Sequence, residues 1–397
     1  MQSISMPVSS STWQMTALPP LALYIHFPWC VKKCPYCDFN SHTLREGVPE
    51  AQYIDALLRD LETCLPLTWG RQVSTIFMGG GTPSLFSAEA MEQLLAGIRA
   101  RVRLQPDAEI TMEANPGTFE ADKFAGYRAA GINRLSIGIQ SFNAGHLQAL
   151  GRIHNDDEAH KAIEIAKRHF DNFNLDIMYA LPQQTLAQAL SDIDTAIAAG
   201  PTHLSAYHLT LEPNTLFHRY PPALPDDDTA ADMQEAIEQH LASAGFEHYE
   251  TSAFCRPGRQ AKHNLNYWKF GDYIGIGAGA HGKISFHDRI IRQMRYKQPG
   301  EYLAQMAAGN AVQTEEPVTL EQLPFEFMLN ALRLVDGFDL DLFTQRTGLP
   351  LTRVIHEIER ATADGLLERD PNDLHRIRPT LRGQRFLNTL LERFLPD

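Results

Sequence analysis

The sequence predicts an α/β protein built on a parallel sheet, as an α/β barrel or partial barrel. Three observations support this prediction. Short β-rich runs alternate with helical stretches, six strand candidates follow one another between residues 21 and 209, and polar residues stand at the ends of several of them. Strands that alternate with helices form parallel sheets. A doubly wound sheet is the alternative that the same alternation allows.

The six predicted strands are short, mostly apolar runs bounded by turn or polar residues. They are Leu21–His26, Ser74–Met78, Glu109–Glu113, Arg134–Ile139, Phe173–Tyr179 and His203–Leu209. Between them lie amphipathic stretches that are predicted to be helices. The main ones are Glu50–Leu65, Ala88–Val102, Asp157–Phe170 and Leu186–Ala199.

The rest of the chain divides into regions of different character. A flexible tail is expected over residues 1–20, the barrel over 21–250, a linker region with HNLNYW and GDYIGIGAGAHG over 251–315, and a C-terminal module over 316–397. Within the barrel region, a Pro- and Asp-rich connection at 221–228 precedes a helix at Thr229–Ala244 and a strand-like segment at His248–Phe254. The C-terminal module contains two helices, a hairpin at Leu366–Arg378 and a closing helix, which is a winged-helix-like order.

The charge and composition restrict the classes of partner. With 44% hydrophobic residues and no low-complexity tract, the chain is expected to be globular. Thirty-five Lys and Arg against 48 Asp and Glu leave a net charge of −13, which disfavours nucleic acid and anionic membranes as partners. The basic hairpin of the C-terminal module, with Arg376 and Arg378, leaves DNA binding as the alternative to a protein contact or a cover over a pocket.

The expected location is the cytoplasm. No run of about 18 apolar residues occurs, and the first 20 residues lack the basic and apolar regions of a secretory signal. The chain has five cysteines, three of them within residues 30–37, and this spacing does not resemble a disulfide framework. Cys64 and Cys255 are expected to be buried thiols without a ligand role.

Cys30, Cys34 and Cys37 form a C-x3-C-x2-C pattern directly after the first predicted strand. A loop at the C-terminal end of a barrel strand is where such folds place their chemistry. Three thiolates on one short loop suit a 4Fe–4S cluster with one iron left open for another ligand. The alternatives are a structural zinc site with His26 or His42 as fourth ligand, and redox thiols.

Other strand ends carry residues that suit the same pocket. Met78-Gly-Gly-Gly-Thr-Pro83 follows the second strand, and it lacks the Lys-Ser/Thr ending of a phosphate loop. Further polar side chains stand at or near the ends of later strands: Glu113, Gln140, Asp176 and Tyr207. A single one could be a polar group at the edge of the core. Four of them beside a cysteine loop predict the rim of one pocket.

These motifs resemble the radical SAM superfamily and, within it, the heme chaperone group HemW, relatives of the oxygen-independent coproporphyrinogen III dehydrogenases. The resemblance covers nearly the whole chain from Leu21. The segments that carry it are YIHFPWCVKKCPYCDFNSH, FMGGGTPS, MEANPG, RLSIGIQSF, LGRIH, HLSAYHLTLEPNT, HNLNYW and GDYIGIGAGAHG. It implies a partial (β/α)6 barrel with a small C-terminal winged-helix-like module.

The resemblance also implies roles for individual residues. Cys30, Cys34 and Cys37 would bind the 4Fe–4S cluster, and S-adenosylmethionine (SAM) would occupy its open iron. The residues expected to contact SAM are Tyr24, Tyr36, Gly80, Gly81, Thr82, Glu113, Gln140, Arg152 and Asp176. Without the resemblance, Arg152 would be taken for a solvated charge. The sequence departs from the group at Ala180 and Gln183, where relatives commonly have Gly, and at His208, where many have Gln.

Three features favour the chaperone over the dehydrogenase, an enzyme that decarboxylates two propionates by radical chemistry. Phe39 stands where the dehydrogenases have a fourth Cys, the segment before Tyr24 is shorter than theirs, and HNLNYW matches the HNxxYW signature of the chaperones. His263 of this signature is the expected heme ligand, and a packed loop with a hydrogen-bonded His is the alternative.

The partners implied are heme, heme-accepting proteins such as respiratory enzymes, and a second copy of the chain in a dimer. Reductive cleavage of SAM is compatible with the resemblance, whereas coproporphyrinogen dehydrogenase activity is not expected. Whether the protein is an enzyme stays open at this point.

Overall fold

The computed structural model describes residues 13–45, 47–68, 70–118 and 121–396. Its centre is a curved sheet whose six central strands run parallel and neighbour one another in chain order. They are β1 (Leu21–Phe27), β4 (Val73–Gly80), β5 (Leu104–Ala114), β6 (Arg134–Gln140), β7 (Phe173–Tyr179) and β8 (His203–His208). The predicted parallel α/β sheet is thereby confirmed, and each predicted strand lies within two residues of its observed position or inside a longer strand.

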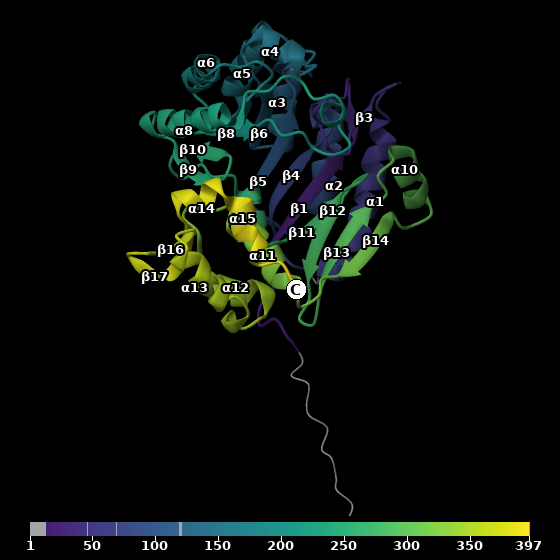
Figure 1. Ribbon diagram of the computed structural model, residues 1–397. Coiled ribbons are helices and arrows are strands. Elements are labelled where there is room, and N and C mark those ends of the chain that lie inside the picture. Colours follow the sequence, from purple (N-terminus) through teal and green to yellow (C-terminus); the bar gives the residue numbers. More distant parts are fainter. Residues whose placement is uncertain (1–12, 46, 69, 119–120, 397) are drawn as a thin grey trace, which may run out of the picture.

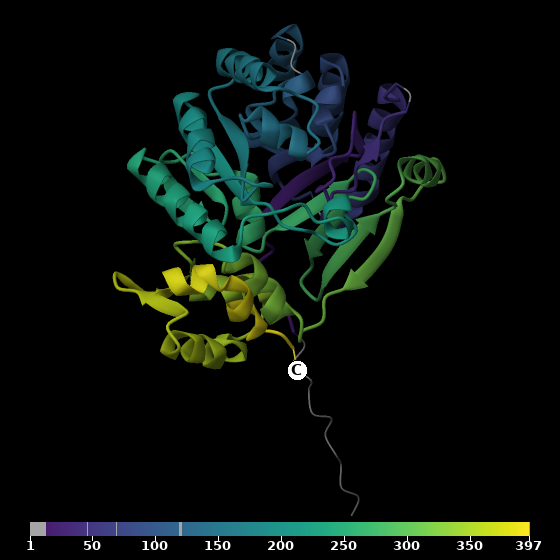
Figure 2. The same cartoon turned by 45° about the horizontal axis from the view of Figure 1, so that its top comes forward.

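Helices cover the outer face of this sheet (Figures 1 and 2). They are α1 (Glu50–Thr68), α2 (Ala88–Arg101), α3 (Ala121–Ala130), α4 (Ala144–Ala149), α5 (Asp156–His169), α6 (Leu186–Ala198) and α8 (Asp227–Ser243). Local sequence explains where some of them begin. Asn155 with Glu158, and Thr185 with Gln188, form reciprocal capping boxes at the starts of α5 and α6.

The sheet continues beyond the six strands on both sides, to twelve in all among the described residues. On the β8 side the predicted strand-like segment 248–254 is a hairpin of β9 (Glu247–Glu250) and β10 (Ala253–Cys255). On the β1 side, β11 (Asp272–Ile276) pairs in parallel with β1, and the antiparallel strands β12 (His281–Ser285), β13 (Ile290–Arg295) and β14 (Val312–Pro317) follow.

Residues 251–315 are therefore not a linker. They supply most of these added strands, together with α9 (Lys262–Trp268) and α10 (Pro299–Ala307). The sequence concealed this because DYIGI and HGKIS are short and rich in glycine, which strands normally disfavour.

The C-terminal part packs around a second hydrophobic core, which also takes in Met15, Phe270 and Ile290, and it lies below the sheet in Figure 1. Its helices are α11 (Leu323–Ala331), α12 (Leu340–Thr347), α13 (Ile355–Ala363), α14 (Leu381–Arg385) and α15 (Leu387–Glu392). Its three-stranded sheet has the order β15 (Phe338–Asp339), β17 (Asp373–Pro379), β16 (Leu367–Asp370), with β16 and β17 forming the wing-like hairpin. Arg385 donates two hydrogen bonds to Glu238 and joins this part to α8.

The predicted flexible tail over residues 1–20 is corrected at its inner end. Trp13 Nε1 donates to the carbonyl of Thr347 at 2.9 Å, and Met15 is buried in the C-terminal core. Two large apolar side chains explain this anchoring, because each gains by leaving water. Residues 1–12 lie outside the described part of the chain.

Among the described residues, none of the helices combines the length and the apolar composition needed to cross a bilayer.

Candidate functional site

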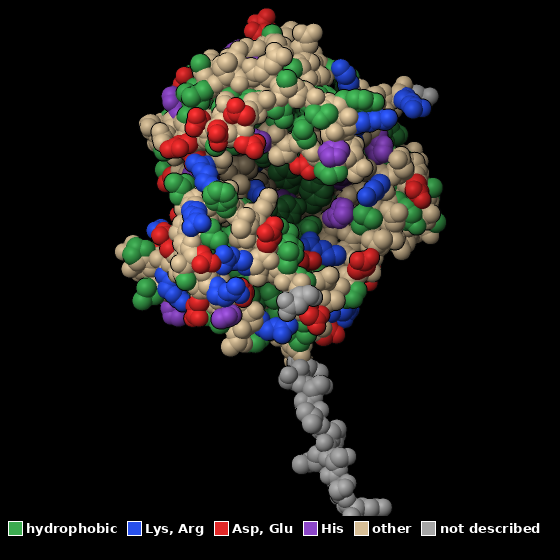
Figure 3. Space-filling model, in the orientation of Figure 1, with side chains coloured by type: hydrophobic (Ala, Val, Ile, Leu, Met, Phe, Trp, Pro, Cys, Tyr) green, Lys and Arg blue, Asp and Glu red, His purple; other side chains and the backbone are tan. Residues whose placement is uncertain are grey.

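Two adjoining cavities open on the inner face of the sheet, of about 380 Å³ and about 710 Å³. Figure 3 shows a hollow on this face with hydrophobic side chains on its floor and histidines around it. The first cavity lies at the carboxyl ends of the parallel strands, and the second lies toward β11–β13 and the C-terminal part. The wall between them is formed by six residues that line both: Cys37, Asp38, Phe39, Ser41, Gly80 and Glu113.

The cysteine loop forms one side of the first cavity. It starts at β2 (Trp29–Cys30) and ends at β3 (His42–Thr43), which pairs with β2. Each of its thiols has at least one polar neighbour. Thr82 Oγ1 donates to Cys30 Sγ at 3.5 Å, Arg152 Nη1 donates to Cys34 Sγ at 3.8 Å, and the Cys37 thiol and Ser41 hydroxyl are 3.8 Å apart.

The three thiols of this loop suit a positively charged metal centre. Burial, and with it the neighbouring thiols, raises the pKa of Cys30 and of Cys37. Bound metal reverses this balance, because a coordinated thiol is deprotonated outright. Three thiols with hydrogen-bond donors beside them therefore fit an iron–sulfur cluster.

The single-metal alternative is less well supported by the geometry. Both ring nitrogens of His26 are hydrogen bonded, to Tyr24 Oη at 3.0 Å and to the Asn40 carbonyl at 2.8 Å. His42 Nε2 is hydrogen bonded to Asn40 Oδ1 at 3.2 Å. In the described ranges no three Cys, His, Asp or Glu side chains surround one metal position. An iron–sulfur cluster does not require three ligands around one position, since each of its thiolates binds a different iron.

The glycine loop packs directly on β1 and the cysteine loop. Gly80 has φ of +109°, and a Cβ atom there would overlap the His26 ring. Gly81 donates its N–H to the Phe27 carbonyl at 2.6 Å, and a Cβ on it would lie 2.5 Å from the Trp29 carbonyl oxygen. The glycines are thus required by the protein's own packing, in addition to any ligand that they approach.

Two partly buried carboxylates face the first cavity. Glu113 Oε2 accepts a hydrogen bond from the Gly80 N–H at 3.1 Å. Burial, with a smaller contribution from Asp176, raises the pKa of Glu113 to about 8. Burial also raises the pKa of Asp176, although Asn174 and Ser136 donate hydrogen bonds to it at 2.8 and 3.0 Å. Both carboxylates would gain from a cationic or hydrogen-bond-donating ligand.

Gln140 and Arg152 also line the first cavity, where both side chains lie beside Gly138. Gln140 has φ of +70°, a strained value for a residue other than glycine. Arg152 Nη2 donates to the Gly138 carbonyl at 2.7 Å, while its buried Nε has no hydrogen-bond partner in the described residues. A buried N–H without a partner is costly and suits a site that is completed by a ligand.

The structure separates the two predicted tyrosines. Tyr36 lines the first cavity, and its ring lies 6.3 Å from that of Phe217 on α7 (Leu216–Arg219). Tyr24 lines the second cavity. Tyr207 and His208, from the end of β8, line the first. Ala180 and Gln183 have φ of +55° and +58°, so this turn keeps a conformation suited to glycine without having glycine.

His263 lines neither cavity. It is completely buried, with Nδ1 hydrogen bonded to Thr75 Oγ1 and Nε2 to Tyr267 Oη, both at 2.8 Å. Heme ligation by His263 stays a prediction, and it would require the ring to give up one of these bonds. Of the HNLNYW segment, Tyr267 and Trp268 line the second cavity.

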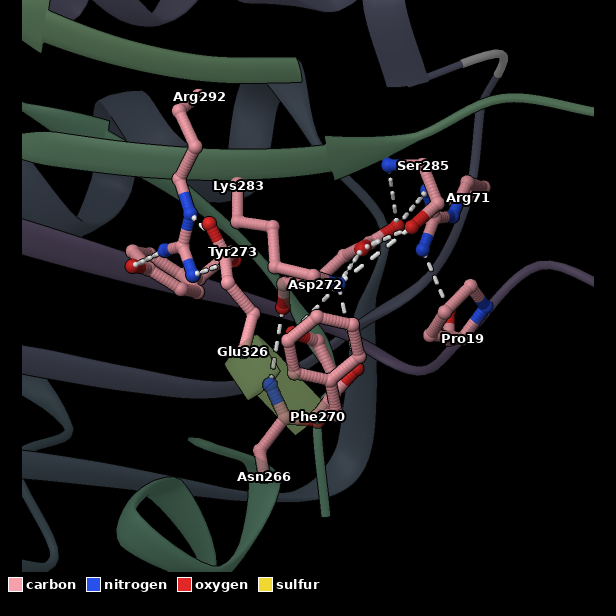
Figure 4. A network of polar contacts seen from close by, with 11 residues as sticks. Pro19, Arg71, Asn266, Phe270, Asp272, Tyr273, Lys283, Ser285, Arg292 and Glu326 are labelled. Atoms are coloured by element: carbon pink, nitrogen blue, oxygen red, sulfur yellow. Dashed lines mark hydrogen bonds and ion pairs between the residues drawn. The ribbon is translucent and has the colours of Figure 1, made fainter. Parts of the chain in front are cut away.

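A buried ionic network fixes this wall of the second cavity (Figure 4). Asp272 on β11 accepts from Lys283 Nζ at 2.9 Å and from Arg71 Nη1 at 2.8 Å, and Asn266 Nδ2 donates to its carbonyl at 2.9 Å. Burial raises the pKa of Asp272, but Lys283 and Arg71 outweigh burial, so the pKa is lowered. The network holds α9 and β12 against β11.

Sequence reasoning missed His281, Arg292 and Lys297, which line the second cavity. His281 stands near the end of GDYIGIGAGAHG, one of the segments that carry the family resemblance. That resemblance assigns no role to the residues of this segment. Gly277 and Gly279 of that segment have φ of +99° and +79°, and they let the chain turn closely past the cysteine loop. Arg292 and Lys297 carry no motif.

Comparisons with known proteins agree with this architecture. The profile of the Radical SAM superfamily matches residues 24–196, and that of the HemN C-terminal domain matches residues 318–386. The solved structure of coproporphyrinogen III oxidase (HemN) from Escherichia coli, a radical SAM enzyme, superposes with a TM-score of 0.80 over 95% of this chain and 90% of that one, at 24% identity. At this identity the likeness shows the fold alone.

Relatives found by sequence comparison share a higher identity with this chain. Heme chaperone HemW of Escherichia coli (strain K12) is 50% identical, with 96% of this chain and all of that protein covered. Heme chaperone HemW of Haemophilus influenzae is 48% identical with the same coverage. The chain therefore belongs to the HemW family, within the radical SAM superfamily.

Proposed function

We propose that this protein is a heme chaperone, which binds heme and delivers it to heme-accepting proteins. The observation that carries the proposal is the 50% identity over the full length of a heme chaperone HemW. The cysteine usage supports a reducing, cytoplasmic location for this activity.

In this proposal Cys30, Cys34 and Cys37 hold a 4Fe–4S cluster, and SAM occupies the first cavity beside it. When bound, the cluster supplies an electron for reductive cleavage of SAM. Thr82 and Arg152 support the cluster, since each donates a hydrogen bond to a cysteine sulfur. Such donors stabilise thiolate charge.

The other SAM contacts follow from the chemistry of the side chains. Glu113 accepts hydrogen bonds from the amino group, Asp176 accepts from the ribose hydroxyls, and Arg152 donates to the carboxylate. The unpartnered Nε of Arg152 supports its role. The remaining contacts come from residues on the walls of the first cavity: Tyr36, Gly80, Gly81, Thr82 and Gln140. Tyr24 lines the second cavity instead, so its predicted contact with SAM is not part of this proposal.

Phe39 supports delivery rather than decarboxylation. It stands where dehydrogenases have a fourth cysteine, and it lies 58% exposed in the wall between the two cavities. An exposed aromatic ring there offers an apolar face to a planar ligand.

The test is an anaerobic assay of the reconstituted protein with coproporphyrinogen III, SAM and a reductant, beside a heme titration. We expect a saturable Soret change with heme and no protoporphyrinogen IX. Protoporphyrinogen formation would replace this proposal with the dehydrogenase.

The acceptors and the assembly state belong to the same proposal. We expect transfer of bound heme to an apo-respiratory heme protein, and a dimer whose fraction depends on the cluster. Sedimentation of cluster-loaded and cluster-free protein measures the second point. Identical, monomeric sedimentation profiles for the two forms would contradict the expected dimer.

A further inference from the structure

We propose that heme binds in the second cavity, with His281 as ligand of the heme iron and with Lys33 and Lys297 as the cations that bind the heme carboxylates. This inference rests on the proposed function, because it assigns a place to the cargo that the function requires.

The size and walls of the second cavity suit a planar macrocycle. Its volume of about 710 Å³ is nearly twice that of the first cavity. A cavity of this size lies within the usual range for organic ligands. Its walls carry six aromatic side chains: Tyr24, Phe39, Tyr267, Trp268, Phe270 and Tyr273. Aromatic faces bury a porphyrin ring well.

The register of the sheet directs His281 into this cavity. His281 pairs with Met294 and Lys283 pairs with Arg292 across β12 and β13. Because side chains alternate along a strand, His281 and Lys283 share one face. Both of them line the second cavity.

His281 is also the histidine that is available to a metal. The other two histidines of the cavity, His26 and His42, are hydrogen bonded to Asn40. His263 uses both of its ring nitrogens. Among the described residues no side chain or backbone group is hydrogen bonded to the His281 ring, which is exposed to the cavity. A free imidazole nitrogen is what an axial heme ligand needs.

Lys33 and Lys297 are the two cations of the cavity that, among the described residues, form no ion pair. Lys33 lies on the cysteine loop, where its Nζ donates to the Phe39 carbonyl at 3.0 Å, and Lys297 follows β13. In the described part of the chain neither lysine has a carboxylate within ion-pair distance, whereas Arg292 is paired with Glu326 and Lys283 with Asp272. The two lysines therefore give the cavity two cations that no ion pair occupies, beside the carboxyl groups of Asp38 and Glu113, which also line it.

Asn40 joins this site to the cysteine loop. Its Nδ2 donates to the Ala278 carbonyl at 2.9 Å and to the Lys297 carbonyl at 2.8 Å. One side chain, three residues after Cys37, thus holds the segment before His281 and the backbone of Lys297. The cysteine loop is a fixed wall of the heme site.

The first experiment titrates the cluster-loaded protein with ferric heme and records the Soret band. We expect His281→Ala to shift the band and to weaken binding about tenfold or more. The surface control His375→Ala should keep the wild-type band. Binding of iron-free protoporphyrin IX, followed by fluorescence, should be unchanged in His281→Ala, because the ring still fits. A wild-type band and affinity in His281→Ala overturns the ligand assignment.

The second experiment compares heme with heme dimethyl ester. The double variant Lys33→Glu/Lys297→Glu should bind heme about tenfold more weakly or worse and should bind the ester as the wild type does. The double control Lys161→Glu/Lys167→Glu, an equal change in charge at two exposed positions of α5, should bind both as the wild type does. Equal losses for heme and ester overturn the carboxylate assignment. Wild-type protein that binds no heme would contradict the proposed function itself, whereas wild-type binding that all these variants leave intact contradicts only this site.

Discussion

Glu113 and Gly80 are joined by a hydrogen bond of 3.1 Å from the Gly80 N–H to Glu113 Oε2. The bond connects the end of β5 to the glycine loop, and that loop is itself bonded to the Phe27 and Trp29 carbonyls. Motifs from three distant stretches of the chain therefore form one wall, and both residues face both cavities.

The raised pKa of Glu113 predicts that the free energy of unfolding of the ligand-free protein depends on pH. Its folded pKa of about 8 lies above the ordinary value of 4.5, so the folded state favours the protonated carboxyl. Stability should fall as the pH rises from about 4.5 to about 8, and then level off. Glu113→Gln keeps the acceptor for Gly80 without the charge. It should be more stable than wild type at pH 9, on the order of 2 kcal/mol, and equal at pH 4.5, in urea unfolding of cluster-free protein.

Glu164→Gln, on the exposed face of α5, is the control for this experiment. It removes the same charge and should leave the profile unchanged. A Glu113→Gln profile parallel to that of wild type would contradict the burial of a neutral Glu113.

The cysteines should divide into two classes. Replacing Cys30, Cys34 or Cys37 by Ala should abolish the 4Fe–4S cluster, because no spare thiol lies on the loop. Cys255→Ala, a change in a buried thiol away from both cavities, should retain the cluster with at most a modest loss of stability, about 1 kcal/mol. Iron and sulfide analysis after anaerobic reconstitution measures both results. Full iron in any of the three loop variants would contradict the assignment.

The sequence predicted the central strands and the first cavity because both depend on local pattern. Apolar runs with polar ends, such as the one that ends in Glu113, follow directly from parallel-sheet geometry. Asp176 was likewise predicted from its place near a strand end, whereas Arg152 was found only through the resemblance, and both line the first cavity.

The second cavity could not be predicted in this way. Its walls come from pairing over long sequence distances, as between Tyr24 and Gly275 in β1 and β11. His281 and Lys297 meet there only because β12 and β13 form a hairpin beside the cysteine loop. The ring of His263 looked available in the sequence, but Thr75, 188 residues away, binds it.

Gly279 should be essential for the close contact of its segment with Asn40 of the cysteine loop. A Cβ at this position would overlap the Asn40 amide, and φ is +79°. Gly279→Ala should therefore cost about 1–3 kcal/mol through backbone strain alone. It should also displace Asn40 and speed loss of the cluster to a chelator. Gly300→Ala, where a Cβ meets no atom within 4 Å and φ is ordinary, is the control. Equal cluster lifetimes in the two variants would show that Asn40 does not steady the loop.

Asp272 should stabilise the fold strongly, because its side chain is fully buried between two cations. Asp272→Asn leaves Lys283, 1% exposed, without a counter-charge, and breaking such a buried pair costs about 3–5 kcal/mol. The lowered pKa of Asp272 fixes the pH window. Its stabilisation is present above the unfolded pKa of a carboxyl and is lost as the pH falls through the folded value, so the gap between wild type and Asp272→Asn should narrow in acid. Urea midpoints at pH 7 and pH 3 measure this gap. Asp107→Asn, which breaks only the exposed pair with Lys262, should leave both midpoints unchanged, and a similarly small effect of Asp272→Asn would contradict the role of the network.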